Sequence, residues 1–181
     1  MVRTIALNTS SRVSRDFFMV LSASLLISLF SYIRIPLFFT PVPLVLQNAL
    51  AVAIGALLGS KKGGLSLLLF LVYGCCNLPV FAGGHFGAAI LLSPFSGGYL
   101  VGYCAAAFVT GKVLELYPSR FSLACMAGFL TVLVLGTSFL ALSIGWGKAF
   151  SLGFAPFIVP DILKAAALAK MFSKLQSTRI T

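Results

Sequence analysis

Acidic side chains are scarce in this sequence. Its 181 residues include three Asp or Glu against 13 Lys or Arg, and charged residues make up 9% of the chain. Water-soluble domains carry far more charge, about a quarter of their residues, because their surfaces face water. The scarcity of charge therefore argues against a soluble globular fold.

Metal ligands are also few. His85 is the only histidine, and it has no cluster of carboxylates or thiols around it in the sequence, so a metal site is not expected. The four cysteines lie in apolar stretches without ligand spacing, at Cys75, Cys76, Cys104 and Cys125. We interpret them as reduced packing residues. No metal and no resident cofactor is therefore expected.

Two further absences limit the function. No phosphate-binding loop of the GxxxxGK[ST] type occurs, so any ATP-driven work must come from partner proteins. The basic residues form no run or interleaved stripe, which argues against nucleic acid as a partner. With about 20 residues for each membrane span, the chain has room for about six spans and no separate catalytic domain. We do not expect an enzyme.

Hydrophobic residues make up 60% of the sequence, and the mean hydropathy is +1.08, as in integral membrane proteins. Charges and Gly/Pro clusters bound six apolar segments, at 17–33, 44–59, 65–77, 97–116, 121–145 and 154–175. We predict an all-α membrane protein with a single domain over 1–181. A bundle of six transmembrane helices at 17–175 would lie between short tails at 1–16 and 176–181.

The basic residues predict the orientation of this bundle. Ten of them fall on one side of the six predicted segments, while Arg34 and Lys148 fall on the other and Lys164 lies within the last segment. Basic residues concentrate in cytoplasmic loops. We therefore expect both termini in the cytoplasm and the protein in the inner, cytoplasmic membrane.

Within the last segment, Asp161 and Lys164 stand three positions apart after Pro156 and Pro160. A helix that starts near Pro160 would place both charges on one face. Each unpaired charge in lipid costs a few kcal/mol or more, so the two must be paired, hydrated or bound to a ligand. This favours a site for a polar solute, and a structural ion pair with Lys164 reaching the membrane surface is the alternative.

The stretch 78–98 is predicted to be an irregular outer lid. It has no formal charge, it is rich in glycine, including Gly83 and Gly84, and it carries Phe81 and Phe86. Such a loop is too apolar for a solvated linker and too broken for a clean span, and long loops of this kind are often lids. A surface loop that dips into the outer leaflet is the alternative.

The first segment has small residues at Ser24, Ser28 and Ser31, which form a stripe on one face of a helix. Small residues let another backbone approach closely, either in a partner or inside the bundle. The sequence leaves both alternatives open. The isolated amide of Gln47 and the hydroxyl of Tyr73 are the polar groups of the next two segments.

Three stretches together resemble the BioY family, the biotin-binding S components of energy-coupling factor (ECF) transporters. They are PVPLVLQ at 41–47, LPVFAGG at 78–84 followed by SGGYLVGY at 96–103, and PFIVPDILKAAALAK at 156–170. The sequence departs from the family at Val45, where a Thr is usual, and at SPFSGGY, where a GPTGGY-like run is usual. Its outer loop also lacks the polar or basic side chains that some relatives place on the ligand.

The resemblance implies an outward-facing biotin pocket, with Asp161 and Lys164 as ligand contacts. Further candidate contacts lie in the matching stretches and in the adjoining segments, at Gln47, Tyr73, Phe81, Gly83, Gly84, His85, Phe86 and Tyr99. The resemblance also implies that the small residues of the first helix, Ser24, Ser28 and Ser31, dock the transmembrane coupling subunit.

We therefore expect biotin uptake, powered by separate ATP-binding subunits and a transmembrane coupling subunit in the lipid bilayer. Two alternatives stay open. One is a solitary carrier of biotin or another vitamin, driven by an ion gradient with Asp161 or Glu115 as its proton site. The other is a structural membrane protein without a substrate.

Overall fold

The computed structural model describes the chain over residues 2–178 and its side chains over residues 13–176. Three of the basic residues that predict the orientation have side chains outside the described range: Arg3, Arg12 and Arg179. Most of the predicted tail at 176–181 also lies outside this range.

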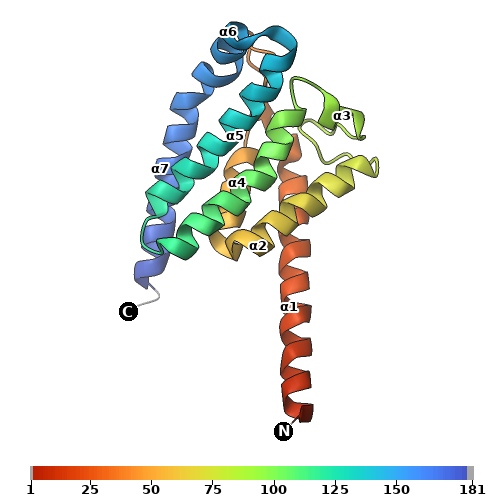
Figure 1. Cartoon of the computed structure of the whole chain (residues 1–181), viewed down its shortest axis with the longest axis vertical. Coiled ribbons are helices and arrows are strands. Elements are labelled where there is room, and N and C mark those ends of the chain that lie inside the picture. Colours follow the sequence, from red (N-terminus) through yellow and green to blue (C-terminus); the bar gives the residue numbers. More distant parts are fainter. Residues whose placement is uncertain (1, 179–181) are drawn as a thin grey trace.

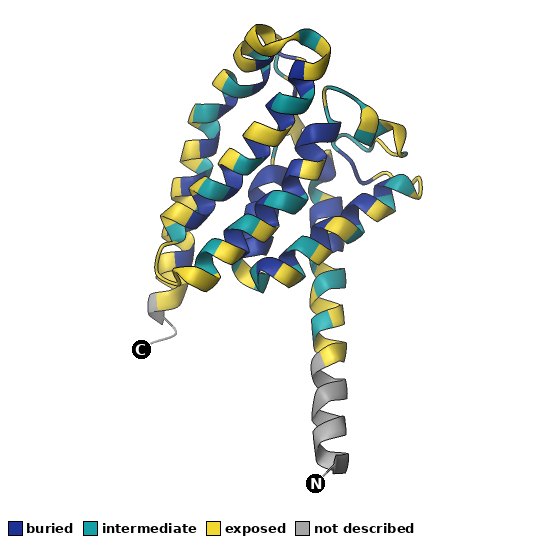
Figure 2. Ribbon diagram, in the orientation of Figure 1, coloured by how far each residue is buried: buried dark blue, intermediate teal, exposed yellow. Residues whose placement is uncertain are grey.

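Five long helices dominate the described chain (Figure 1), and they are α1 (Val2–Leu29), α2 (Gln47–Cys75), α4 (Gly97–Leu116), α5 (Phe121–Ile144) and α7 (Ala155–Thr178). The shorter elements connect them, and they are η1 (Phe30–Tyr32), β1 (Arg34–Ile35), β2 (Leu44–Val45), α3 (Ala89–Leu92), α6 (Trp146–Ala149) and the π-helix η2 (Phe150–Phe154). In Figure 2 the buried residues lie on the faces that the helices turn toward each other.

Within residues 2–178, five helices are long and apolar enough to cross a membrane. The sequence indicated six segments, and the segments predicted at 44–59 and 65–77 correspond to two helical stretches that meet at a kink inside α2. The segment predicted at 97–116 agrees with α4. The protein is therefore a helical membrane protein, as predicted. Five helices stand against six predicted segments because α2 contains two of those segments.

A kink divides α2 at Gly59, whose backbone has φ 80° and ψ 175°. This left-handed φ is open to glycine and strained for other residues. The kink frees the backbone N–H of Ser60, which donates to Glu115 Oε1 over 2.9 Å, and the Ser60 hydroxyl donates to the same oxygen over 2.6 Å. Lys62 just beyond the kink pairs with Asp16 of α1 over 2.7 Å. Glu115 and Asp16 thus hold the bend in place.

Glycines let α2 and α4 approach closely. A Cβ atom at Gly55 would overlap the backbone of Ala107, and one at Gly111 would overlap the backbone of Ser60. Without a hydrophobic drive between helices in lipid, close packing of this kind is what joins them. The two halves of α2 are therefore held against α4 on both sides of the kink.

Gly111→Val should lower the thermal midpoint of the protein in detergent by about 3–10 °C. The added atoms meet rigid backbone, and overpacking of this kind typically costs about 1–3 kcal/mol, which corresponds to a few degrees per kcal/mol at this size. Gly147→Val is the matched control, since nothing lies within 4 Å of a Cβ atom there. Equal midpoints for the two variants would contradict the close contact of α2 and α4.

The end of the molecule with α3 and α6 is irregular (Figure 1). The proline-rich connection at 36–43 is not helical, and strands β1 and β2 flank it as a short antiparallel pair. Thr40 in this connection donates its hydroxyl hydrogen to the carbonyl of Leu152 in η2 over 2.6 Å. The stretch 78–98 is mostly irregular, as predicted, and includes the short helix α3.

Candidate functional site

Asp161 and Lys164 form a buried ion pair on α7. Lys164 Nζ lies 3.0 Å from Asp161 Oδ1, and the side chains are 19% and 3% exposed respectively. The pair lies one and four residues after Pro160, which stands inside α7 and lacks the backbone N–H that would donate to the carbonyl of Pro156. The prediction that both charges share one helix face is confirmed.

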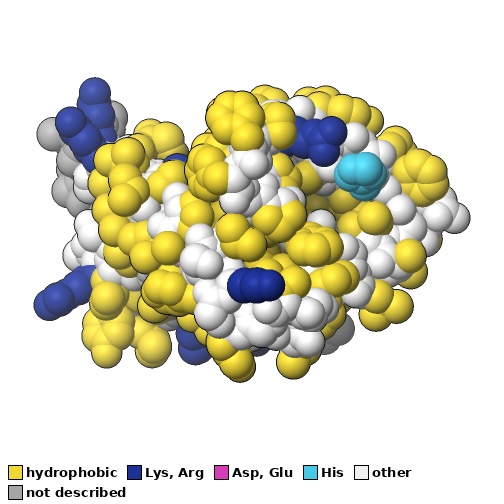
Figure 3. Space-filling view, turned by 90° about the horizontal axis from the view of Figure 1, so that it is seen from above, with side chains coloured by type: hydrophobic (Ala, Val, Ile, Leu, Met, Phe, Trp, Pro, Cys, Tyr) yellow, Lys and Arg dark blue, Asp and Glu magenta, His cyan; other side chains and the backbone are white. Residues whose placement is uncertain are grey.

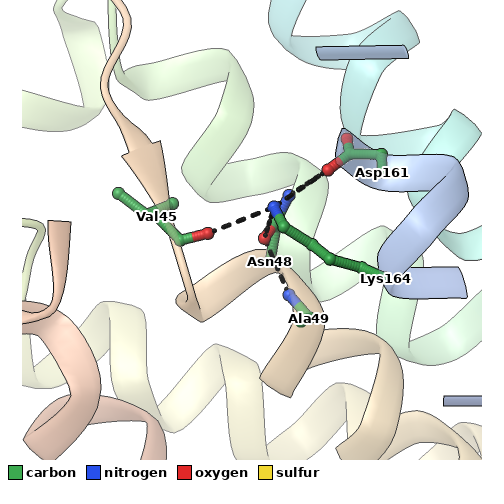
Figure 4. A network of polar contacts seen from close by, with 5 residues as sticks. All are labelled: Val45, Asn48, Ala49, Asp161 and Lys164. Carbon is green, nitrogen blue, oxygen red and sulfur yellow. Dashed lines mark hydrogen bonds and ion pairs between the residues drawn. The ribbon is translucent and has the colours of Figure 1, made fainter. Parts of the chain in front are cut away.

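Asn48 at the start of α2 joins both members of the pair (Figure 4). Its Nδ2 donates to Asp161 Oδ1 over 2.9 Å, and its Oδ1 accepts from Lys164 Nζ over 3.0 Å. The same Oδ1 accepts from the backbone N–H of Ala49 over 2.8 Å. A reversed amide would set its NH₂ group against two donors and its oxygen against a carboxylate, so these contacts fix the orientation of Asn48.

The strand β2 supplies the remaining contact. Lys164 Nζ also donates to the carbonyl of Val45 over 3.4 Å. Val45 ends β2 and α2 begins at Gln47, so the site assembles where a strand turns into a helix. Side chains from α2 and α7 and a carbonyl from β2 therefore meet at one polar cluster, which we call the Asp161 site: Val45, Asn48, Asp161 and Lys164 (Figure 4).

Two buried oxygen atoms near the start of α2 and on α7 accept no hydrogen bond. They are Asp161 Oδ2 and Gln47 Oε1. A buried acceptor without a donor is expensive, by roughly 1–3 kcal/mol and more for a charged group. Both atoms are acceptors, so a ligand that satisfies them must present hydrogen-bond donors.

Gln47 and Tyr99 are buried, and each is fixed by a backbone carbonyl. Gln47 Nε2 donates to Ile27 of α1 over 3.3 Å and to Val80 over 3.2 Å, so this amide joins α1 and the base of the lid. The Tyr99 hydroxyl donates to the carbonyl of Gly153 in η2 over 2.8 Å. Gln47 thus fixes the start of α2 next to Asn48, and Tyr99 fixes η2 just before α7.

The other predicted contacts lie on or beside the lid. No hydrogen bond or ion pair of the described residues joins them to Asp161 or Lys164. Phe81 is 1% exposed and packs against Phe70 of α2, with ring centroids 5.6 Å apart, so it anchors the lid in the core. His85 and Phe86 are exposed, and Tyr73 lies 3.4 Å from the Ser24 hydroxyl on α1.

Gly83 and Gly84 give the lid its shape. Both have φ of 77°, a left-handed conformation that suits glycine. The turn they form is closed by a hydrogen bond from the Gly84 N–H to the carbonyl of Phe81 over 2.8 Å, and the Gly83 N–H donates to Ser31 over 2.8 Å. These glycines therefore dock the lid onto the end of the first helical segment.

The small-residue stripe packs inside the chain. Ser24, Ser28 and Ser31 are 0%, 9% and 0% exposed. Ser24 donates to Leu21 over 2.8 Å, and Ser28 donates to the carbonyl of Ser24 over 2.7 Å. The structure thus corrects the expectation of a docking face, because residues already covered by their own chain offer no surface to a partner.

The sequence as a whole matches one family. The sequence model of the BioY family matches residues 3–180. The chain belongs to the BioY family. Among curated members, a probable biotin transporter BioY of Pyrococcus horikoshii is 41% identical over 136 residues, which cover 75% of this chain and 82% of the relative. The biotin transporter BioY of Rhizobium etli is 36% identical over 162 residues, which cover 82% and 86%.

A solved structure of the same class agrees with the fold. The crystal structure of the S-component for biotin from an ECF-type ABC transporter superposes with a TM-score of 0.81 at 27% sequence identity. The match covers 92% of this chain and 93% of that one. The helical arrangement described above is therefore that of a BioY-family S component over nearly its whole length.

Asn48 is the site residue that the sequence did not reveal. It follows Gln47 in an apolar run and matches no motif by itself. One signal in the sequence could have pointed to Asn48. An Asp and a Lys in an apolar segment need further hydrogen-bond partners, and few side-chain amides in an apolar chain can supply them.

Proposed function

We propose that this chain is the biotin-binding S component of an ECF-type ABC transporter and that it serves biotin uptake. The observation that carries the proposal is the agreement of family, fold and site. The BioY match spans residues 3–180, and the fold covers 93% of a biotin S component. In the Asp161 site, the buried acceptor Asp161 Oδ2 has no hydrogen-bond donor within the described part of the chain.

Biotin offers the hydrogen-bond donors that Asp161 Oδ2 lacks among the described residues. Its ureido ring presents two N–H donors and one carbonyl acceptor. In this proposal an N–H group satisfies Asp161 Oδ2, while Lys164 and Asn48 hold Oδ1 in place. Because the site's own polar atoms are already oriented, binding loses little freedom, which favours tight binding.

The outer end of the molecule suits an anionic ligand. Seen from above, this end carries Lys and Arg side chains and the histidine, and no Asp or Glu is visible on it (Figure 3). Biotin bears a carboxylate on its valerate chain. A cationic entrance raises the local concentration of such an anion and its association rate.

The proposal also includes how the chain crosses the membrane. We count the halves of α2 on the two sides of Gly59 as separate passes, which makes six, with both termini in the cytoplasm. Gly59 lies beside Glu115 near the end of α4, so α2 turns back at that level of the bundle. The excess of basic residues at this end supports a cytoplasmic location in the inner membrane.

Coupling to ATP hydrolysis would come from a transmembrane coupling subunit and ATP-binding subunits, and the chain would work without a cofactor or catalytic step of its own. The solitary ion-driven carrier finds less support. Glu115, one of its two candidate proton sites, accepts two hydrogen bonds from Ser60 and holds the kink of α2.

Titration of the purified protein with biotin tests the proposal. We expect saturable binding with a sub-micromolar Kd and an increase in the thermal midpoint, since the ligand supplies donors to buried acceptors. Cells that express the chain with coupling and ATP-binding subunits should take up biotin, and cells with the chain alone serve as the comparison. A well-folded sample without binding refutes the proposal, and equal uptake by the chain alone favours the solitary carrier.

A further inference from the structure

A groove runs between the start of α5 and the C-terminal half of α7, and none of its lining residues belongs to the Asp161 site. It has a volume of about 840 Å³. Its polar lining consists of two cations and three hydroxyl groups, from Arg120, Lys170, Ser119, Ser122 and Ser173. Nothing in the biotin-binding role uses these residues.

The two cations of this groove have no acidic side chain to neutralise them. The chain has three acidic residues in total. Within the described side chains, each of the three is paired with another base: Asp16 with Lys62, Glu115 with Lys112 and Asp161 with Lys164. Arg120 and Lys170 therefore present positive charge that an external anion can neutralise.

The groove continues into an apolar one. Its apolar lining includes Leu123, Met126 and Ala166. Met126 also lines a second cavity of about 150 Å³ between α5 and α7, which ends at Ile158, Asp161 and Ile162. The alanines of α7 leave a shallow surface there. Cations and hydroxyls at one end and hydrocarbon along the rest match an amphipathic anion.

The groove and the second cavity together form a seam between α5 and α7, and the length of this seam matches one leaflet of a bilayer. Along α5, Arg120 lines the polar end and Leu133 the apolar end. At about 1.5 Å per residue, this stretch spans about 20 Å. One leaflet with its headgroups is about 20–22 Å thick. Basic pockets between helices at the cytoplasmic side are suited to anionic lipid headgroups.

We propose that this groove binds one anionic phospholipid of the inner leaflet, with its phosphate at Arg120 and Lys170 and an acyl chain along Met126 and Leu133. This binding site goes beyond the recognition of biotin, and its place in the inner leaflet rests on the orientation proposed above.

Binding can be measured by native mass spectrometry and by the thermal midpoint of the purified full chain, with added phosphatidylglycerol or phosphatidylcholine. We expect retention of about one phosphatidylglycerol and a higher midpoint with it than with phosphatidylcholine. Each basic residue near an anionic headgroup contributes about fivefold in affinity. Arg120→Gln/Lys170→Gln should therefore weaken phosphatidylglycerol binding by about 25-fold.

Two further variants separate the groove from general surface charge. Lys61→Gln/Lys112→Gln removes two cations outside the groove lining and should change binding less than about twofold. Lys112 pairs with Glu115 over 3.5 Å at an exposed position, and such pairs contribute little. Ala166→Leu keeps both charges and fills the exposed groove, so it should lower phosphatidylglycerol retention without unfolding the protein.

Three outcomes overturn the proposal. The first is equal binding of phosphatidylcholine and phosphatidylglycerol by the parent. The second is equal losses in the groove variant and in the Lys61/Lys112 control, which would indicate surface charge alone. The third is full stabilisation by inorganic phosphate, which would make the occupant a free anion.

Discussion

Asp161→Ala should abolish biotin binding, with a loss of affinity of at least about 100-fold. The variant removes the carboxylate oxygen that we assign to the ligand. It also leaves the partly buried Lys164 without its anion and Asn48 Nδ2 without its acceptor. Truncating one partner of a buried, hydrogen-bonded charged contact in an interface typically costs about 2–5 kcal/mol of binding free energy, and every 1.4 kcal/mol is a factor of ten in affinity. Isothermal titration with biotin measures the effect.

A double variant distinguishes a ligand contact from a structural role. Asp161→Leu/Lys164→Met removes both charges at once, and such replacements of buried pairs are often neutral or stabilising. We expect the double variant to keep the parent's thermal midpoint and to lack biotin binding. Parent-like binding by this variant would show that the pair is structural and that biotin binds elsewhere.

Helix positions were the part of the fold that the sequence predicted well. The segment at 97–116 agrees with α4, because Gly97 follows a broken loop and Pro118 follows the helix end. The segment at 121–145 lies within one residue of α5 (Phe121–Ile144) for the same reason. Apolar runs bounded by Gly, Pro and charge report where a chain enters and leaves a membrane.

The course of α2 could not be predicted in the same way. The run SKKGG at 60–64 indicated a turn between two helices. The structure has two helical stretches there, and it joins them directly at the non-helical residue Gly59, where α2 bends. What stabilises this bend is Glu115, which lies 55 positions away along the chain. Local patterns do not contain such a contact.

The Asp161 site was predictable in part. The spacing of Asp161 and Lys164 indicates a shared helix face, since residues three apart on a helix are neighbours. Asn48 reaches them from a helix 113 positions earlier. Only the pairing of α2 with α7 in space shows that this amide holds both charges.

The serine stripe shows a second limit of prediction from the sequence. Small residues allow close approach of helices, both within a chain and between chains. The pattern at Ser24 and Ser28 is the same in both cases, so it predicts a contact without identifying the partner. Burial decides the question, and Ser24 lies 3.4 Å from the Tyr73 hydroxyl of the same chain.

Ser24→Leu/Ser28→Leu should therefore destabilise the isolated protein and reduce its biotin binding. Each substitution adds a branched hydrocarbon side chain where the exposed fraction is 0% and 9%. Overpacking typically costs about 1–3 kcal/mol at each site. For a chain of this size, we expect the thermal midpoint in detergent to fall by about 5–20 °C. Binding should fall with it, because α1 supports Gln47 through the carbonyl of Ile27.

An exposed face of α1 provides the matched control. Leu25 and Leu29 are 54% and 70% exposed, so Leu25→Phe/Leu29→Phe adds volume on the same helix where lipid can yield. We expect this control to keep the parent's midpoint and its affinity for biotin. Co-purification with the coupling and ATP-binding subunits then completes the test. If the serine variant folds and binds biotin normally but no longer co-purifies with them, the stripe docks the coupling subunit after all, and α1 must move away from α2 to expose it.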